Sequence, residues 1–250
     1  MVKSHRRRCF FLVLSMLIQC GCQRHLYSPP AQPNNAQGPN TLGKDQTAIS
    51  GQYGLSDDLF GPHVHAGSFT ARHGISETLD FEFRGAVMML RHRYEDDDST
   101  DEKTRDHVMV AARTGAKWAP KALSGHVALT GGLGFGSSEA GQFVSPDVGF
   151  IAGWVNAYVT PFYGLTGFLS QPIDPKYVNL ADPHEMPDMQ RPKLSYGLQQ
   201  SVGLTAELSA GQTARWSLLA ALTSTLIADF KEDTDELLFN GFAIEVGYRF

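Results

Sequence analysis

The last nine residues constrain the fold most strongly, because polar and apolar side chains alternate strictly along them. Large apolar or aromatic side chains occupy Phe242, Ile244, Val246, Tyr248 and Phe250, and the positions between them are small or charged. Successive side chains of a β-strand point to opposite faces, so this stretch predicts a strand with one apolar and one polar face. A soluble β-sandwich and a membrane barrel both use this pattern.

A terminal Phe with an aromatic residue two positions earlier resembles the C-terminal signal strand of Gram-negative outer-membrane β-barrel proteins. The resemblance implies a small barrel of the OmpA/OmpX-like kind, with its apolar face against lipid and its polar face toward the lumen. It also implies that Phe242, Ile244, Val246, Tyr248 and Phe250 form the assembly signal that the barrel-assembly machinery binds. No stretch approaches the ~18 apolar residues of a membrane helix. The mean hydropathy of -0.21 is compatible with a barrel, since alternation dilutes hydropathy.

The first 21 residues predict a secretory signal peptide. Lys3, Arg6, Arg7 and Arg8 form a basic region, and a short apolar core follows from Phe10 to Ile18. Removing this segment leaves 17 basic and 26 acidic residues, a net charge of -9. So acidic a body predicts no nucleic-acid partner.

The stretch Leu17-Ile18-Gln19-Cys20-Gly21-Cys22 resembles a bacterial lipoprotein box, whose Cys is lipidated after cleavage. Cleavage before Cys22 places the small Gly21 at the cut, which favours Cys22 as the lipidated residue. Cleavage before Cys20 is the alternative, and an ordinary signal peptide with incidental cysteines is a third reading. All three cysteines lie in the first 22 residues, so no disulfide is expected in the mature body.

Three domains are expected along the chain. A signal peptide covers 1–21, and a flexible periplasmic linker covers 22–45, where Pro, Asn, Gln and Gly predominate. An all-β, antiparallel up-and-down transmembrane β-barrel covers 46–250, with about ten strands (about eight to twelve). The expected strands are 46–55, 62–74, a third starting at Leu79, 107–118, 127–135, 147–158, 162–171, 193–208, 213–228 and the C-terminal strand.

The expected connections alternate in length. Short turns are predicted at 119–123, 159–161 and 209–212, with a hinge at Thr160-Pro161, and long loops at 95–106, 136–146, 172–192 and 229–236. Periplasmic turns of such barrels are short and outer loops are longer, so both termini are expected in the periplasm. Trp118, Trp216, Tyr158, Phe162 and Tyr163 are predicted to form an interfacial aromatic girdle.

The polar face of the strands predicts the lining of the lumen. Acidic and basic residues are nearly balanced there, and the interior of a barrel of ~8–10 strands is about filled by side chains. Buried charges need partners, so a narrow, ion-paired lumen is expected. The lumen ion-pair candidates are Asp80, Glu82, Arg84, Arg113, Lys117, Glu207, Arg215, Glu245 and Arg249.

No catalytic residue, metal site or cofactor is predicted. The histidines near the expected rim are His63, His65, His92, His107 and His184. A dyad of His107 with Asp106 or Asp101 can be drawn, but no known enzyme motif surrounds it. The acidic run Glu95 to Glu102 offers hard oxygen ligands for Ca²⁺ but lacks the glycine of an EF-hand loop.

The sequence therefore favours an outer-membrane barrel of a Gram-negative bacterium that acts as a structural or surface-interaction protein. Its expected partners are outer-membrane lipid, the barrel-assembly machinery and a surface ligand at the outer loops. A narrow passive diffusion channel and a rim enzyme acting on lipid or peptide are the alternatives.

Overall fold

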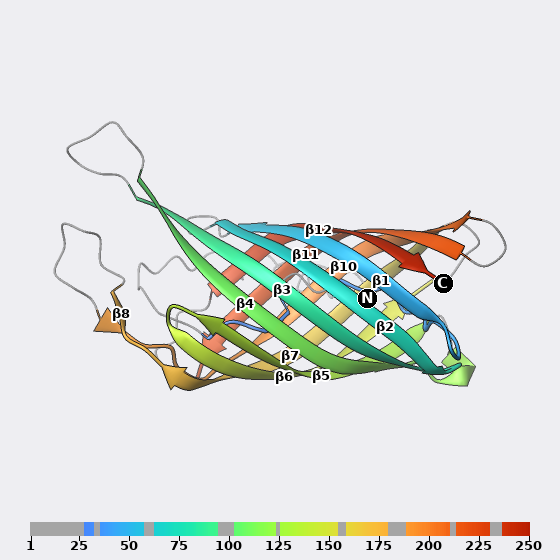
Figure 1. Ribbon diagram of the computed structural model, residues 1–250, viewed down its shortest axis with the longest axis horizontal. Coiled ribbons are helices and arrows are strands. Elements are labelled where there is room, and N and C mark those ends of the chain that lie inside the picture. Colours follow the sequence, from blue (N-terminus) through green and yellow to red (C-terminus); the bar gives the residue numbers. More distant parts are fainter. Residues whose placement is uncertain are drawn as a thin grey trace, which may run out of the picture.

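The computed structural model describes residues 28–32, 36–57, 63–94, 103–123, 126–154, 159–179, 189–210, 214–230 and 237–250. Within these ranges, ten long antiparallel strands close into one barrel (Figure 1) in the order β1-β12-β11-β10-β7-β6-β5-β4-β3-β2. The barrel strands are β1 (Thr47–Asp57), β2 (His63–Ser76), β3 (Leu79–Tyr94), β4 (Lys103–Trp118), β5 (Val127–Ser138), β6 (Gly141–Gly153), β7 (Val159–Pro175), β10 (Ser195–Ala210), β11 (Ala214–Asp229) and β12 (Leu237–Arg249). The predicted ten-stranded, up-and-down barrel is confirmed.

Two further elements lie outside the barrel wall. The strands β8 (Val178–Asn179) and β9 (Met189–Gln190) pair into a small separate sheet, and the 3-10 helix η1 (Lys121–Leu123) lies between β4 and β5. No helix in the described part of the chain is long and apolar enough to cross a membrane.

The first and last strands close the barrel. β1 and β12 pair in continuous register from Ala48 opposite Arg249 to Asp57 opposite Asn240. Phe250 continues this ladder, because its N–H donates to the Thr47 carbonyl at 3.0 Å and its carbonyl accepts the Thr47 N–H at 3.1 Å. The weak first strand is therefore what completes the ladder of hydrogen bonds.

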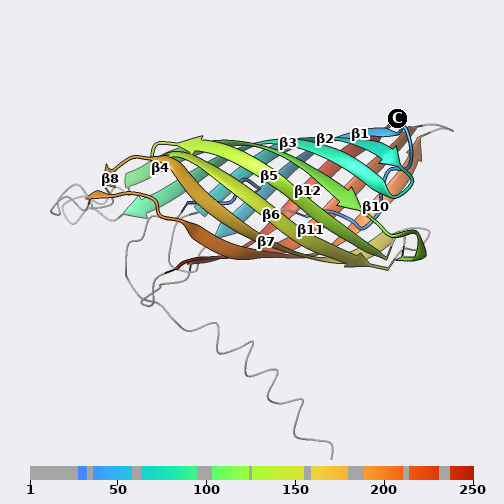
Figure 2. The ribbon, with the colours of Figure 1, turned by 90° about the horizontal axis from the view of Figure 1, so that it is seen from below.

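The barrel has two different ends, which we name by their connections. The turn end holds the start of β1, the end of β12 and the connections that follow Ser76, Trp118, Gly153 and Ala210. The loop end holds the connections that follow Asp57, Tyr94, Ser138, Pro175 and Asp229. Figure 1 shows the chain's C-terminus at the turn end and β8 at the loop end, and Figure 2 shows the same tilted strands after a 90° rotation.

Two of the predicted connections are wrong in detail. Residues 136–146 do not form a long loop, because β5 and β6 continue to a two-residue turn at Glu139-Ala140. Gly141 permits this turn, since its φ is +113° and a Cβ there would lie 1.8 Å from the Asp174 carbonyl oxygen. The Thr160-Pro161 hinge is also wrong, because both residues lie inside β7, where the Pro161 carbonyl accepts the Trp154 N–H at 3.0 Å.

The barrel has an apolar outside and a charged inside. On β3, Phe81 and Phe83 are 49% and 45% exposed, whereas the residues that alternate with them, Asp80, Glu82 and Arg84, are 0%, 2% and 1% exposed. The same alternation leaves Phe242, Ile244 and Val246 exposed on β12 while Ala243 is buried. A soluble protein buries apolar side chains and exposes charged ones, so this distribution is reversed.

Candidate functional site

The N-terminal part of the described chain runs along the inside of the barrel. We call residues 28–32 and 36–46 the lumen segment. Composition predicted a flexible linker for 22–45, whereas Ser28, Ala31, Gln32 and Ala36 are at most 3% exposed and the segment bonds to the wall along its length. The composition of this stretch predicts flexibility because the stretch itself contains few residues that could hold it in one conformation. Its hydrogen-bond partners belong to the barrel wall instead.

At the loop end, hydroxyl groups hold the start of the lumen segment. The Ser28 side chain lies 2.7 Å from the Ser170 hydroxyl of β7, and that hydroxyl donates to the Pro29 carbonyl at 2.7 Å. The Ser195 hydroxyl of β10 donates to the Ser28 carbonyl. Since Ser195 begins β10, Ser28 lies at the loop end of this part of the wall.

At the turn end, a buried carboxylate holds the other end of the lumen segment. Both oxygens of Asp80 lie 3.1 Å from the Leu42 N–H, and Lys117 donates to the Gly38 carbonyl at 3.2 Å. The chain then reverses into β1 at Gly43, whose φ is +91°. Gly74 allows the close approach there, because a Cβ on it would lie 1.8 Å from the Gly43 carbonyl oxygen.

Two small apolar clusters pack the lumen segment against the wall. Ala31 contacts a cluster that contains Met88, Met109 and Phe143, and Ala36 contacts one that contains Ile151 and Phe162. Phe162 therefore faces the lumen at 4% exposure, and its predicted place in an outer aromatic girdle is wrong. The wall opposite Ala31 is Gly134, where a Cβ would lie 2.1 Å from the Ala31 Cβ.

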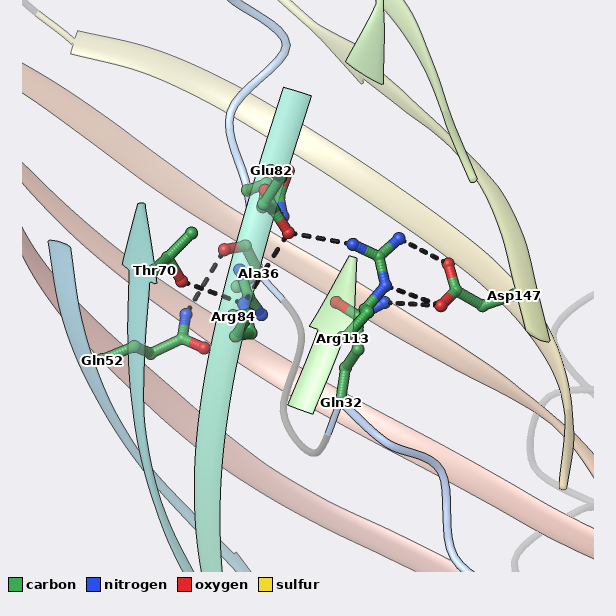
Figure 3. Close-up of polar contacts among 9 residues, drawn as sticks. Gln32, Ala36, Gln52, Thr70, Glu82, Arg84, Arg113 and Asp147 are labelled. Carbon is green, nitrogen blue, oxygen red and sulfur yellow. Dashed lines mark hydrogen bonds and ion pairs between the residues drawn. The ribbon is translucent and has the colours of Figure 1, made fainter. Parts of the chain in front are cut away.

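A buried network of charges crosses the middle of the lumen (Figure 3). Arg113 on β4 binds Asp147 on β6 through two contacts of 2.7 Å and Glu82 on β3 through one of 3.0 Å. Arg84 lies 3.8 Å from Glu82 and donates to the Thr70 hydroxyl at 3.0 Å. A bidentate guanidinium–carboxylate pair is among the strong charge-assisted contacts, and it offsets part of the cost of removing these charges from water.

The lumen segment takes part in this network. Gln32 donates to Asp147 at 3.0 Å, and Gln37 donates to Glu82 at 2.8 Å. In return, Gln199 of the wall donates to the Gln32 carbonyl at 2.7 Å and Gln52 donates to the Ala36 carbonyl at 3.3 Å. Figure 3 shows Gln32 and Ala36 among these wall side chains, so the segment and the charges form one polar interior.

The remaining ion-pair candidates lie toward the turn end. Asp80 and Lys117 are opposite each other in the β3–β4 register. Glu207 is 3.5 Å from Arg215 and 3.4 Å from Arg249, and this group is partly exposed. Glu245 lines a cavity that these three residues also line.

That cavity has a volume of about 70 Å³ and lies beside Gln37, Gly38 and Pro39. Within the described part of the chain, the oxygens Gln37 Oε1 and Thr205 Oγ1 are buried without a hydrogen-bond partner. The walls are polar and the volume suits only a few water molecules, so the cavity fits water better than a solute.

The rim histidines form isolated pairs. His63 lies 3.0 Å from Asp57, His65 is 2.8 Å from the Tyr53 hydroxyl, and His107 is 3.2 Å from Glu139. His107 thus pairs with a residue of the β5–β6 turn. Of the two partners expected from the sequence, Asp101 and the side chain of Asp106 lie outside the described residues. Within the described residues no group of three or more His, Cys, Asp or Glu side chains could hold a metal ion. Cys20, Cys22, His184, the acidic run 95–102 and the side chain of His92 lie outside the described residues.

Sequence reasoning missed two parts of this interior. Asp147 alternates with the outward-facing Val148 and belongs to the polar face, a signal that the alternation of β6 already carried. The prediction of ion pairs covers charged residues alone, so it does not include the neutral residues Gln52, Gln199, Ser170 and Ser195. The lumen segment itself carries no periodic pattern that could have indicated burial.

Comparisons with known proteins find structural similarity but no match in sequence. No protein-family model and no curated protein matches the chain. Ail, the attachment invasion locus protein of Yersinia pestis, solved with the heparin analogue sucrose octasulfate, is 13% identical with a TM-score of 0.34, over 83% of this chain and 99% of that chain. A bacterial polysaccharide outer membrane secretin is 9% identical with a TM-score of 0.32, over 82% of this chain and 99% of that chain. At these values the likeness assigns neither a family nor a ligand.

Proposed function

We propose that this protein is an outer-membrane β-barrel whose lumen is closed by its own N-terminal segment, and that it acts as a structural or surface-interaction protein. The observation that carries the proposal is the lumen segment, bonded to the wall from Ser28 to Leu42. A barrel filled in this way supplies a rigid transmembrane support for the connections at its loop end.

The outer surface supports a membrane location. Aromatic residues lie near both ends of the wall. Trp118, Trp154 and Trp216 are exposed at the turn end, and the tilted rings of Tyr196 and Phe230 lie at the loop end with their centroids 4.6 Å apart. Trp216 and Phe230 are 14 residues apart along β11 and its end, roughly 35 Å along the axis of a barrel with strands tilted by ~40°. That separation suits aromatic belts on either side of an apolar band of ~25 Å.

The connection lengths support one orientation. The longest connection, between Pro175 and Ser195, lies at the loop end, and the turn end holds the start of β1 and the end of β12, as expected of a periplasmic side. The loop end therefore faces outside. A surface ligand would then bind at the loop end, and the apolar face of β12 would serve as the assembly signal and meet lipid.

The filled interior favours a scaffold over a diffusion channel. A conducting path needs continuous water, whereas the network at Arg113 and the lumen segment occupy the centre of the barrel. The cavity near Gln37 accommodates only a few waters. Conduction would require the segment to leave the lumen.

Planar-bilayer recording tests this proposal with the wild-type protein and a variant that lacks residues 28–40. We expect no stepwise conductance from the wild type and clear steps from the deletion variant, with both proteins migrating faster in SDS before heating than after. Equal conductance from the two folded proteins would overturn the closed-scaffold proposal. Identical migration before and after heating, with solubility in the absence of detergent, would overturn the membrane proposal.

A further inference from the structure

The outer face of β10, β11 and β12 carries a row of polar side chains within an apolar wall. These three strands are neighbours in the barrel (Figure 1), and Gln200, Ser224 and Asn240 lie opposite one another in their register. The row faces outward, because its members alternate with buried residues such as Ser201 and Thr225. On β10 the outward residues on either side of Gln200 are apolar and exposed: Leu198, Val202 and Leu204.

The depth of the row places it inside the apolar band. Ser224 is eight residues from Trp216 and six from Phe230, which belong to the two aromatic belts. At ~2.5 Å per residue for strands tilted by ~40°, Ser224 lies about 20 Å from the turn-end belt and about 15 Å from the loop-end belt. An apolar band of ~25 Å centred between the belts therefore extends about 10 Å beyond Ser224 toward the loop end.

An amide at this depth needs a hydrogen-bond partner. Hydrocarbon offers none, and an unpaired polar group inside the membrane is costly. The side chain of Gln200 has two N–H donors and an acceptor oxygen, more than the single hydroxyl of Ser224 opposite it can satisfy. Within the described part of the chain, the side chains of Gln200, Ser224 and Asn240 make no hydrogen bond. The groups that satisfy Gln200 therefore belong to another molecule.

We propose that two copies of this chain associate in the membrane through β10, β11 and β12, with Gln200 at the contact. The proposal rests on the membrane location proposed above. An amide both donates and accepts, so two Gln200 side chains related by a two-fold axis satisfy each other, as a contact between identical subunits requires. The exposed side chains of Leu198, Val202 and Leu222 lie next to the row and supply the packing surface.

Cysteine cross-linking tests the contact in isolated membranes. All three native cysteines lie in the first 22 residues, so Gln200→Cys introduces the only thiol of the barrel. Val87→Cys is the matched control, because Val87 is also exposed on the outer face but belongs to β3, on the other side of the barrel. After oxidation, we expect Gln200→Cys to give a species of twice the mass in non-reducing SDS. The wild type and Val87→Cys are expected to remain monomeric.

An association measurement in lipid vesicles tests the hydrogen bonds themselves. Copies labelled at Lys121→Cys in the exposed η1 with a donor or an acceptor dye report association by energy transfer as lipid is added. We expect Gln200→Leu to lower the association constant about 10-fold, because the hydrogen bonds of both amides are lost. Thr114→Leu removes an exposed hydroxyl from the outer face of β4 and is expected to leave the constant within about twofold.

The other outcomes separate this inference from the proposed function. Equal cross-linking of the two cysteine variants would indicate random collision, and a product of another mass would indicate a different membrane protein; either result overturns self-association. Absence of the cross-link, or equal association of Gln200→Leu and the wild type, overturns it as well. In each of these cases heat-modifiable migration leaves the barrel proposal intact, whereas its absence in the wild type would refute the proposed function itself.

Discussion

The packing of Ala31 against Gly134 yields a sharp prediction for the substitution Gly134→Ala. The added Cβ would lie 2.1 Å from the Ala31 Cβ, whereas it would be 3.5 Å from the nearest wall atoms, the carbonyl oxygens of Ala112 and Ser145. The wall therefore tolerates the new methyl group, and the lumen segment does not. β5 is held by β4 and β6 on either side, so we expect the segment to move.

The size of the effect follows from this geometry. Carbon atoms pack at ~3.5–4.0 Å, so the segment must shift by about 1.5 Å at Ala31. Overpacking of this kind costs ~1–3 kcal/mol, and the shift also weakens the bonds of Gln32 to Asp147 and Gln199. A cost of about 2 kcal/mol corresponds to a roughly 30-fold larger population of molecules in which the lumen segment is displaced from the barrel wall.

Thiol labelling of a Ser170→Cys background measures that population. Ser170 is fully buried beneath Ser28 and Pro29, so its thiol reacts only when the segment leaves. We expect Gly134→Ala to raise the labelling rate by about 30-fold and Gly131→Ala to leave it within about twofold. Gly131 lies on the same strand, and a Cβ there has its nearest contact at 3.7 Å. Equal rates in the two variants would refute the placement of Ala31 against β5.

Two further predictions concern the network and the closing strand. Arg113→Ala leaves the buried carboxylates of Glu82 and Asp147 without their main partner, so we expect a loss of ~3–5 kcal/mol, against ~1 kcal/mol or less for the exposed Arg215→Ala control. The urea concentration at which half of each variant loses its heat-modifiable migration measures both losses of stability. Equal midpoints for the two variants would contradict the stabilising role of the network at Arg113. Removal of Phe250 deletes both hydrogen bonds to Thr47 and is expected to lower the membrane-assembled fraction well below that of the exposed Ile173→Ala control. Equal assembled fractions in cell fractionation would reject the assembly-signal proposal.

The strands were predictable because each carries its own two-residue period. Phe81 and Phe83 alternate with Asp80 and Glu82 in the sequence, and the same residues face outward and inward in the barrel. The boundaries were less predictable where glycine and proline sit inside strands. Pro161 predicts a hinge by its residue type, but its missing N–H is tolerated within β7. The turn before Gly141 depends on the positive φ of that glycine, which the neighbouring residue types do not indicate.

The interior of the barrel was also predictable only in part: the sequence indicated which side chains face inward, but not which of them contact one another. Local alternation placed Glu82 and Arg113 on one face of their strands, but their contact depends on the register of β3 against β4. Asp147 comes from a third strand, and only closure of the sheet brings its carboxylate within 2.7 Å of Arg113.

By itself, the sequence determined a ten-stranded alternating sheet, because the faces of a strand are encoded residue by residue. Only the tertiary structure decided what fills the barrel. Residues 28–32 and 36–42 have the composition of a linker, and no local pattern sets their position. Their burial depends on partners such as Ser170 and Asp80, which lie 142 and 38 residues from the groups they hold. A segment that is held in place by hydrogen bonds to distant residues acquires its structure from the barrel that surrounds it.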